Sequence, residues 1–206
     1  MRTKSLSAIL ILGICISIFP QENQFPNVNV PLEKIKGIPI GWTLAGSNPR
    51  DYEIRQDDFD PYSGYFSSSL KSIVNRPQGY VTLMQVIKSD KYKGERISFS
   101  GYVKAKFVAD WAGLWMRVDD VIGRPLSFDN MNDRPIVGNS DWVKYEVVLD
   151  VPMNSSEISF GVLLDGKGQI WFDKFEIKVV GMEIPVTDRL KNKFEETEPR
   201  NLDFEQ

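Results

Sequence analysis

The stretch from Ala109 to Asp120, ADWAGLWMRVDD, places two tryptophans, one arginine and three acids close together. On an extended strand, alternate side chains share a face, which puts Trp111, Trp115, Arg117 and Asp119 on one side. An indole ring can stack on the apolar face of a pyranose, while arginine and aspartate bind hydroxyl groups. The pattern therefore predicts a saccharide-binding face on this strand.

The other side of the same strand is small and aliphatic. We expect it to face the interior, because burying Arg117 and Asp119 instead would cost several kcal/mol unless both were paired. A second interpretation of Trp115 stays open: a loop or the N-terminal lead-in covers the indole, which then belongs to a smaller second core. The predicted core residues of this strand are Ala112, Leu114, Met116 and Val118.

A second group of polar residues follows in LSFDNMNDRP, Leu126 to Pro135. Alternation predicts that Leu126 and Phe128 point inward and Asp129 outward, so that Asp129 and Asn130 line the same surface as Trp115. The density of oxygen ligands is compatible with Ca²⁺, but EF-hand spacing is absent. An Asx-rich turn that bonds to its own backbone is the favoured interpretation.

Composition excludes several chemistries. The 206 residues include no histidine and one cysteine, Cys15, which rules out a Ser-His-Asp triad and histidine-ligated zinc. The carboxylates Asp119, Asp129 and Glu146 could pair as acid and base in glycoside cleavage, but no pattern puts two of them in a cleft. A net charge of −3 without a basic stripe argues against a nucleic-acid partner. We predict a non-catalytic protein.

The ends of the chain differ from its middle. Residues 1–19 combine a basic start with a short apolar run, which predicts a signal peptide or an N-terminal anchor and hence a secreted or periplasmic protein. Membrane attachment would require that this segment stay uncleaved or that Cys15 be lipidated; LGIC resembles a lipoprotein box except for Ile14. Residues 20–39 are predicted to be an extended lead-in and residues 182–206 a charged tail.

Residues 40–181 show a hydrophobic period of two. The runs at residues 97–105, 143–151 and 158–164 each place apolar side chains on one face, and turns rich in Gly and Pro separate them. In QIWFDKFEIKVV the phase slips after Phe172, which predicts a β-bulge at Asp173 and Lys174. The pattern predicts an all-β fold, an antiparallel β-sandwich.

The chain resembles bacterial carbohydrate-binding-module-like jelly rolls of the galactose-binding-domain type from Gly41 to about Val180. The best-matched stretches are GERISFSGYVKA, DWVKYEVVLDVP and GQIWFDKFEI. This resemblance implies a jelly roll that binds a saccharide. The alternative is a protein-interaction or structural module with a protein partner in the cell envelope.

The resemblance also implies a structural Ca²⁺ site, in which the acid of an opening N-x-D-F-E strand joins an aspartate of the closing strand. The matching position of the closing strand is Asp173, and Glu33 stands nearest to the expected opening acid. A closer match to the opening motif, NLDFE, lies at the C-terminus, from Asn201 to Glu205. This displacement weakens the calcium prediction.

Overall fold

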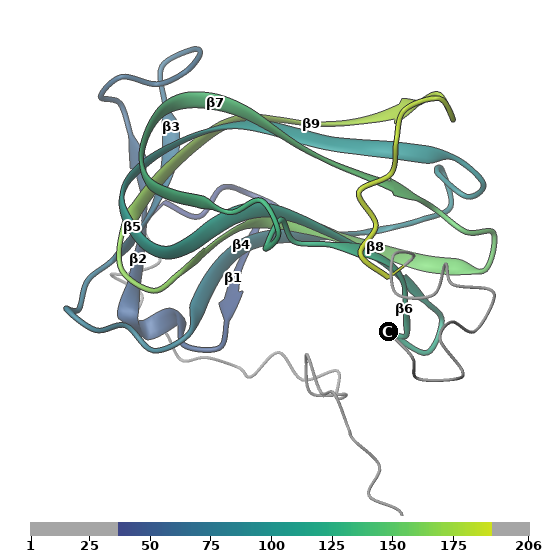
Figure 1. Ribbon diagram of the computed structural model, residues 1–206, viewed down its shortest axis with the longest axis horizontal. Coiled ribbons are helices and arrows are strands. Elements are labelled where there is room, and N and C mark those ends of the chain that lie inside the picture. The colour runs from purple at the N-terminus through teal and green to yellow at the C-terminus, as the bar shows by residue number, and fades with distance from the viewer. Residues whose placement is uncertain (1–36, 191–206) are drawn as a thin grey trace, which may run out of the picture.

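Two layers of antiparallel strands form the structure, a computed structural model that describes residues 37–190 (Figure 1). Those residues contain one short 3-10 helix, η2, and nine strands. The elements are β1 Thr43–Gly46, η2 Pro49–Asp51, β2 Tyr52–Asp57, β3 Ser67–Ser72, β4 Tyr80–Lys88, β5 Arg96–Asp120, β6 Pro125–Asp129, β7 Ile136–Asp150, β8 Ser155–Asp165 and β9 Gln169–Val180.

Strand β5 belongs to both layers. Its first half pairs with β7 and β9, and its second half pairs with β8 and β6. Between the halves, Phe107 has a φ of 53°, a left-handed value that is uncommon for a residue other than glycine. The β9 layer therefore consists of β7, the first half of β5, β9, β3 and β2. The β8 layer consists of β1, β4, β8, the second half of β5 and β6.

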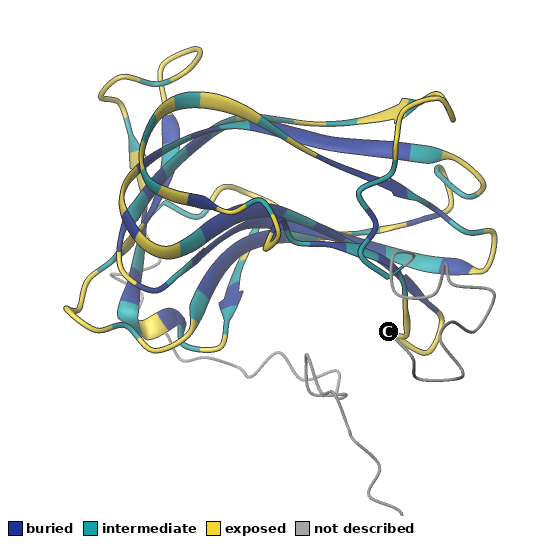
Figure 2. Ribbon diagram, viewed as in Figure 1, coloured by how far each residue is buried: buried dark blue, intermediate teal, exposed yellow. Residues whose placement is uncertain are grey.

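The core lies between the two layers, where buried segments of the strands face each other (Figure 2). The predicted inner residues of β5, from Ala112 to Val118 at alternate positions, are all fully buried, and this prediction is confirmed. The predicted bulge is also confirmed: the register between β5 and β9 shifts next to Asp173, and Lys174 has a φ of 53°. The predicted all-β sandwich is the observed fold.

Two predictions of side-chain direction were wrong. Val143 is 42% exposed although it is paired with the fully buried Val103 of β5, because β7 pairs with no other described strand and lies at the edge of the sheet. Asp129 points inward and is fully buried, while Leu126 and Phe128, which were predicted to point inward, are partly exposed, and Phe128 pairs with Arg117 on the outer phase of β5. The alternation rule failed at Asp129 because a guanidinium, that of Arg134, compensates the buried charge.

The first residues of the predicted tail pack against strand edges. The Thr187 N–H donates to the Val148 carbonyl of β7 (2.8 Å), and the Arg189 N–H donates to the Phe128 carbonyl of β6 (2.8 Å). Asp188 lies between them and accepts a bond from the Phe128 N–H (3.1 Å). This segment therefore covers the exposed edges of two strands, which protects them from pairing with other chains.

Asp120 organises the turn between β5 and β6. Its carboxylate accepts bonds from the N–H groups of Ile122 and Arg124 and from the Arg124 guanidinium (2.9, 2.9 and 2.8 Å). The Arg124 backbone N–H is the main cause that holds the pKa of Asp120 below its usual value. The charged form is thus favoured in the folded protein, so its contribution is complete above the unfolded pKa and is lost as pH falls below about 4.

We expect Asp120→Asn to lower the melting temperature at pH 7 by a few degrees, because the amide cannot accept all three bonds. The difference from the unmodified protein should shrink as the pH is lowered toward 3. Thermal unfolding followed by circular dichroism across this range measures both effects. Asp58→Asn, at an exposed loop residue, serves as the control; equal losses in both variants at pH 7 would refute the role of Asp120.

Candidate functional site

The outer face of the β9 layer carries aromatic rings around one lysine. The Lys104 Nζ lies 5.0 Å from the ring centroid of Trp142 and 5.0 Å from that of Trp171. It also forms an ion pair with Asp60 (2.8 Å). Strand pairing explains the arrangement, because Lys104 of β5 is directly opposite Trp171 of β9 and both point outward. The ammonium group is held between two indole faces by cation–π attraction.

Both indole rings are fixed by hydrogen bonds from their N–H groups. Trp171 Nε1 donates to the Asp57 carboxylate (2.7 Å), and Trp142 Nε1 donates to the Asp60 carbonyl (3.3 Å). Asp57 ends β2, two strands away from β9 across the sheet. Trp171 is therefore oriented by a strand of the sheet, which lowers the entropy that a ligand would lose on binding it, whereas Trp142 is bonded to the loop between β2 and β3.

A hollow of about 430 Å³ lies beside these rings. This volume is at the lower end of the range for small-molecule sites. Its polar lining residues include Asn139, whose side-chain oxygen accepts the Phe107 N–H (2.8 Å), and Lys106, whose Nζ lies 5.7 Å from the Phe107 ring centroid. Its lining residues are Phe59, Lys104, Ala105, Lys106, Asn139, Ser140 and Trp171. An aromatic ring and polar side chains that line one hollow can bind a ligand that has both an apolar face and hydroxyl groups.

The strand residues predicted to bind a ligand lie on the outer face of the opposite, β8 layer. Trp115 is partly exposed, and its Nε1 donates to the Thr82 hydroxyl on β4 (2.7 Å). Since Trp115 is paired with Gly161 of the intervening strand β8, its indole reaches across that strand to Thr82. Trp111 is also partly exposed and donates to Asp165 (3.2 Å). Trp115 thus has both an exposed part and a packing contact.

Arg117 and Asp119 form an ion pair on this β8-layer face. Arg117 Nε donates to Asp119 Oδ2 (2.9 Å), and Asp119 is only 5% exposed. Burial raises the pKa of Asp119, and the Arg117 guanidinium offsets part of that rise. The other carboxylate oxygen, Oδ1, is buried without a hydrogen-bond partner. Asp119 is therefore engaged mainly by Arg117, and little of its carboxylate is open to a ligand.

The turn residues Asp129 and Asn130 are separated by burial. Asp129 is fully buried and paired with Arg134, so it does not line the surface of Trp115 as expected. Asn130 is partly exposed, and its side chain accepts a bond from the Asn132 N–H (3.4 Å), as an Asx turn does. The backbone carbonyl oxygen of Asn130 lies close to Gly113, so that a Cβ atom at position 113 would be 3.2 Å from it.

The residues predicted to bind calcium do not form a ligand set in the described part of the chain. Asp173 accepts bonds from the N–H groups of Ser63 (2.8 Å) and Lys174 (2.6 Å). Residues 37–190 hold no group of three or more acids, histidines or cysteines placed for a metal ion. Glu33 lies outside the described residues, as do Cys15 and the NLDFE stretch. The calcium site stays a prediction.

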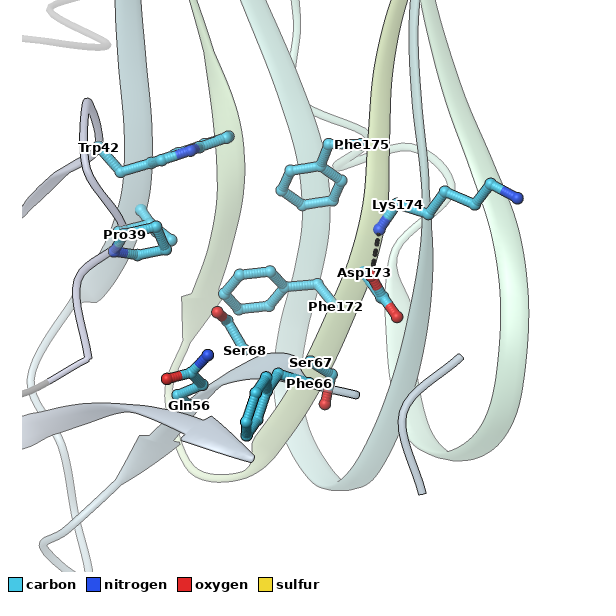
Figure 3. Close-up of a pocket in the computed structure, with 11 residues that line it drawn as sticks. Pro39, Trp42, Gln56, Phe66, Ser67, Ser68, Phe172, Asp173, Lys174 and Phe175 are labelled. Carbon is cyan, nitrogen blue, oxygen red and sulfur yellow. Dashed lines mark hydrogen bonds between the residues drawn. The ribbon is translucent and has the colours of Figure 1, made fainter. Parts of the chain in front are cut away.

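A second hollow, of about 320 Å³, opens at the side of the sandwich (Figure 3). Its walls are aromatic: the Phe172 and Phe175 rings stack 5.5 Å apart, and Trp42 lies 5.6 Å from Phe175. Figure 3 shows the side chains of Asp173 and Lys174 directed away from it. The polar residues that line this hollow are Gln56, Ser67, Ser68, Asp173 and Lys174.

The sequence contained a signal for the β9-layer residues that we did not weigh. Trp142 lies two residues before Lys144, and Trp171 lies two residues before Asp173, so each indole shares a strand face with a charged residue. Both positions are out of phase with the core residues of their strands. The same rule that placed Trp115 outward places these two indoles outward. Only the pairing of β5 with β9 brings Lys104 to them, and sequence spacing does not show that pairing.

Comparison with known proteins shows which folds the structure resembles. No protein-family model matches the chain. The structure is similar to the C-terminal family 22 carbohydrate-binding module of Clostridium thermocellum Xyn10B, with a TM-score of 0.50 and 19% identity over 70% of this chain and 89% of that one. The chain has the fold of a carbohydrate-binding module. The structure is also similar to the enzymatically active domain of tailspike protein 4 from bacteriophage CBA120. The TM-score is 0.53, with 16% identity over 71% of this chain and 20% of that one.

One relative is closer in sequence. The HTH-type transcriptional regulator YbfP of Bacillus subtilis (strain 168) is 42% identical over 167 residues. The match covers 81% of this chain but only 57% of the regulator. The chain thus spans little more than half the length of this relative.

Proposed function

We propose that this carbohydrate-binding-module-like domain binds a saccharide, without catalysis, on the outer face of the β9 layer. The observation that carries the proposal is the position of Trp171: its ring forms a wall of the hollow, and its orientation is fixed by Asp57. The Lys104 Nζ lies over one face of this ring, so the C–H face of a pyranose stacks on the opposite face in this proposal. Lys106 and Asn139 line the same hollow and supply the polar groups that bind hydroxyl groups in this proposal.

The face around Trp115 is a weaker candidate for the same function. Trp115 is partly exposed and lies in neither of the two hollows described above. Its charged neighbours, Arg117 and Asp119, are bonded to each other. The β9-layer face combines ring surface, polar groups and a hollow, and this combination favours it.

Affinity electrophoresis of the protein against a panel of soluble polysaccharides tests the proposal. The panel should include xylan, galactan, mixed-linkage β-glucan and an α-glucan. We expect retardation by at least one of them, with dissociation constants weaker than those of deep pockets because the hollow is open on one side. Migration of the protein unchanged by every polysaccharide, with bovine albumin as the non-binding reference, would refute saccharide binding.

Binding without catalysis is supported by the state of the three carboxylates considered as acid and base. Asp119 and Asp129 are each paired with an arginine, and Glu146 accepts a hydrogen bond from the Ser98 hydroxyl. Asp129 is also fully buried. None of the three lines either of the two hollows described above. The carboxylates have structural partners, and we propose no reaction for them.

A second candidate function is ligand recognition within a regulatory protein. The identity to YbfP over most of this chain favours it, because that relative is described as a transcriptional regulator. Both candidates give the domain a ligand and differ in what the ligand controls. A protein partner in the cell envelope is the remaining alternative, and co-purification of such a partner with a protein that binds no polysaccharide would favour it.

Secretion through residues 1–19 is part of the same proposal, and these residues lie outside the described part of the structure. Within residues 37–190, no helix is long and apolar enough to cross a membrane. A saccharide-binding protein with a signal peptide would meet its ligand outside the cytoplasm. Whether the segment is cleaved, retained or lipidated at Cys15 is decided by mass spectrometry of the mature N-terminus.

A further inference from the structure

The loop between β2 and β3, residues 58–66, stands next to the aromatic face of the β9 layer. In Figure 1 it rises at the upper left beside the bend of β7, and Figure 2 shows it as mostly exposed. The loop is unusually aromatic for an exposed segment. Its rings belong to Phe59, Tyr62, Tyr65 and Phe66, all of them exposed. Clustered exposed rings of this kind are typical of a surface that binds a ligand or a partner.

One of these rings lies flat on the face. The Tyr62 ring stacks on the Tyr102 ring of β5 with centroids 3.6 Å apart and planes 14° apart. Tyr62 is nevertheless 37% exposed. A flat ring at this distance occupies the space in which the C–H face of a pyranose would stack on Tyr102. Tyr62 therefore covers an aromatic surface of the kind that saccharides use.

The covered ring lies next to the hollow. Tyr102 and Lys104 point outward from β5 two residues apart, which separates them by roughly 7 Å along the strand. Lys104 is in turn opposite Trp171. Tyr102 and Trp171 thus belong to neighbouring rows of one face, and a ligand that contacts both must contain more than one sugar ring.

The loop is held by a few polar contacts and by the Tyr62 ring, which stacks on Tyr102 and packs edge-on against Trp142 (centroids 6.0 Å). Asp60 pairs with Lys104 (2.8 Å) and accepts the Trp142 indole N–H, and the Ser63 N–H donates to Asp173 (2.8 Å). Asp60 has a φ of 57°, in the left-handed region. Surface contacts of this kind each contribute little free energy, so local opening of the loop costs much less than unfolding.

We propose that Tyr102 is a second saccharide subsite, which Tyr62 covers when no ligand is bound. This inference rests on the proposed function and adds to it that the ligand is an oligosaccharide of at least two rings. A sugar ring replaces Tyr62 on Tyr102 when the loop opens. The apparent dissociation constant then equals that of the open form divided by the fraction of molecules in which the loop is open.

Tyr62→Ala tests the proposal, because it uncovers Tyr102 permanently. If the open form is roughly 10 to 30% of the unmodified protein, affinity should rise about three- to tenfold. The matched control is Tyr65→Ala, another exposed tyrosine of the same loop, which should leave affinity unchanged. In the double variant Tyr62→Ala/Tyr102→Ala, the gain should disappear, which separates uncovering of Tyr102 from general loosening of the loop.

The measurement is affinity electrophoresis with the polysaccharide that retards the unmodified protein most, or with the whole panel if none does. Tighter binding by Tyr62→Ala alone supports the covered subsite. Weaker or equal binding by Tyr62→Ala, with retention of the unmodified protein, overturns this inference and leaves the proposed function standing. If neither protein is retained by any polysaccharide, both are refuted.

Discussion

Arg134→Ala should lower the free energy of unfolding by about 3 kcal/mol, which corresponds to a fall in melting temperature of roughly 6 to 12 °C. The reason is the full burial of its partner, Asp129. Arg134 contacts both carboxylate oxygens of Asp129, through Nη1 (3.2 Å) and through Nη2, and also bonds to the Glu146 carbonyl of β7 (3.3 Å). Without the guanidinium, the buried carboxylate keeps the Met131 N–H as its one donor among residues 37–190 (2.9 Å).

Chemical unfolding followed by tryptophan fluorescence measures this loss. Arg55→Ala is the matched control, because Arg55 also pairs with an acid, Glu53 (2.8 Å), but its side chain is 69% exposed. Exposed pairs of this kind contribute less than about 1 kcal/mol. A loss for Arg134→Ala no larger than that for Arg55→Ala would show that the buried pair does not hold β6 to β7. Arg134→Lys should recover only part of the stability, since an ammonium cannot bond both oxygens as a fork does.

Trp171→Ala should weaken saccharide binding by about 10- to 100-fold while leaving the domain folded. An aromatic anchor that a ligand covers on binding commonly accounts for about 1.5 to 3 kcal/mol of the binding free energy. Trp171 lies on the outer face of β9, so its removal opens no cavity between the layers. Trp171→Phe keeps a stacking ring but loses the bond to Asp57, and it should retain part of the affinity.

Isothermal titration with the retained polysaccharide measures these affinities, and circular dichroism checks the fold of each variant. Trp115→Ala is the control of the same residue type, on the outer face of the other layer. It should lose stability, since its indole bonds to Thr82, but keep its affinity. A folded Trp171→Ala protein that binds as tightly as the unmodified one would remove Trp171 from the site.

Much of the sandwich was predictable from alternation alone. Ile97 and Phe99 face the core because the polar residues on either side of each in the sequence leave only one face of the strand that can be buried. The bulge at Lys174 was predictable for the same reason, since Phe172 and Phe175 both had to face inward. These are local rules, and they hold where one face of a strand is buried.

The passage of β5 between layers was not predictable in this way. Its inner residues on both sides of Phe107 face the same core, so the alternation continues through a change of sheet without a visible break. Asp129 was misplaced because its partner is supplied by a turn five residues later. The candidate site was missed because Asp60, Lys104 and Trp171 meet only through the pairing of distant strands and the path of one loop.

The most direct test of the central claim is a titration of the ¹⁵N-labelled protein with an oligosaccharide from the retained polysaccharide, followed through its five tryptophan indole N–H resonances. Each indole reports a different place on the molecule. If the site is the outer face of the β9 layer, the resonances of Trp142 and Trp171 shift on binding, and those of Trp111 and Trp115 stay in place. Shifts confined to Trp111 and Trp115 would contradict the account and assign the saccharide to the opposite face.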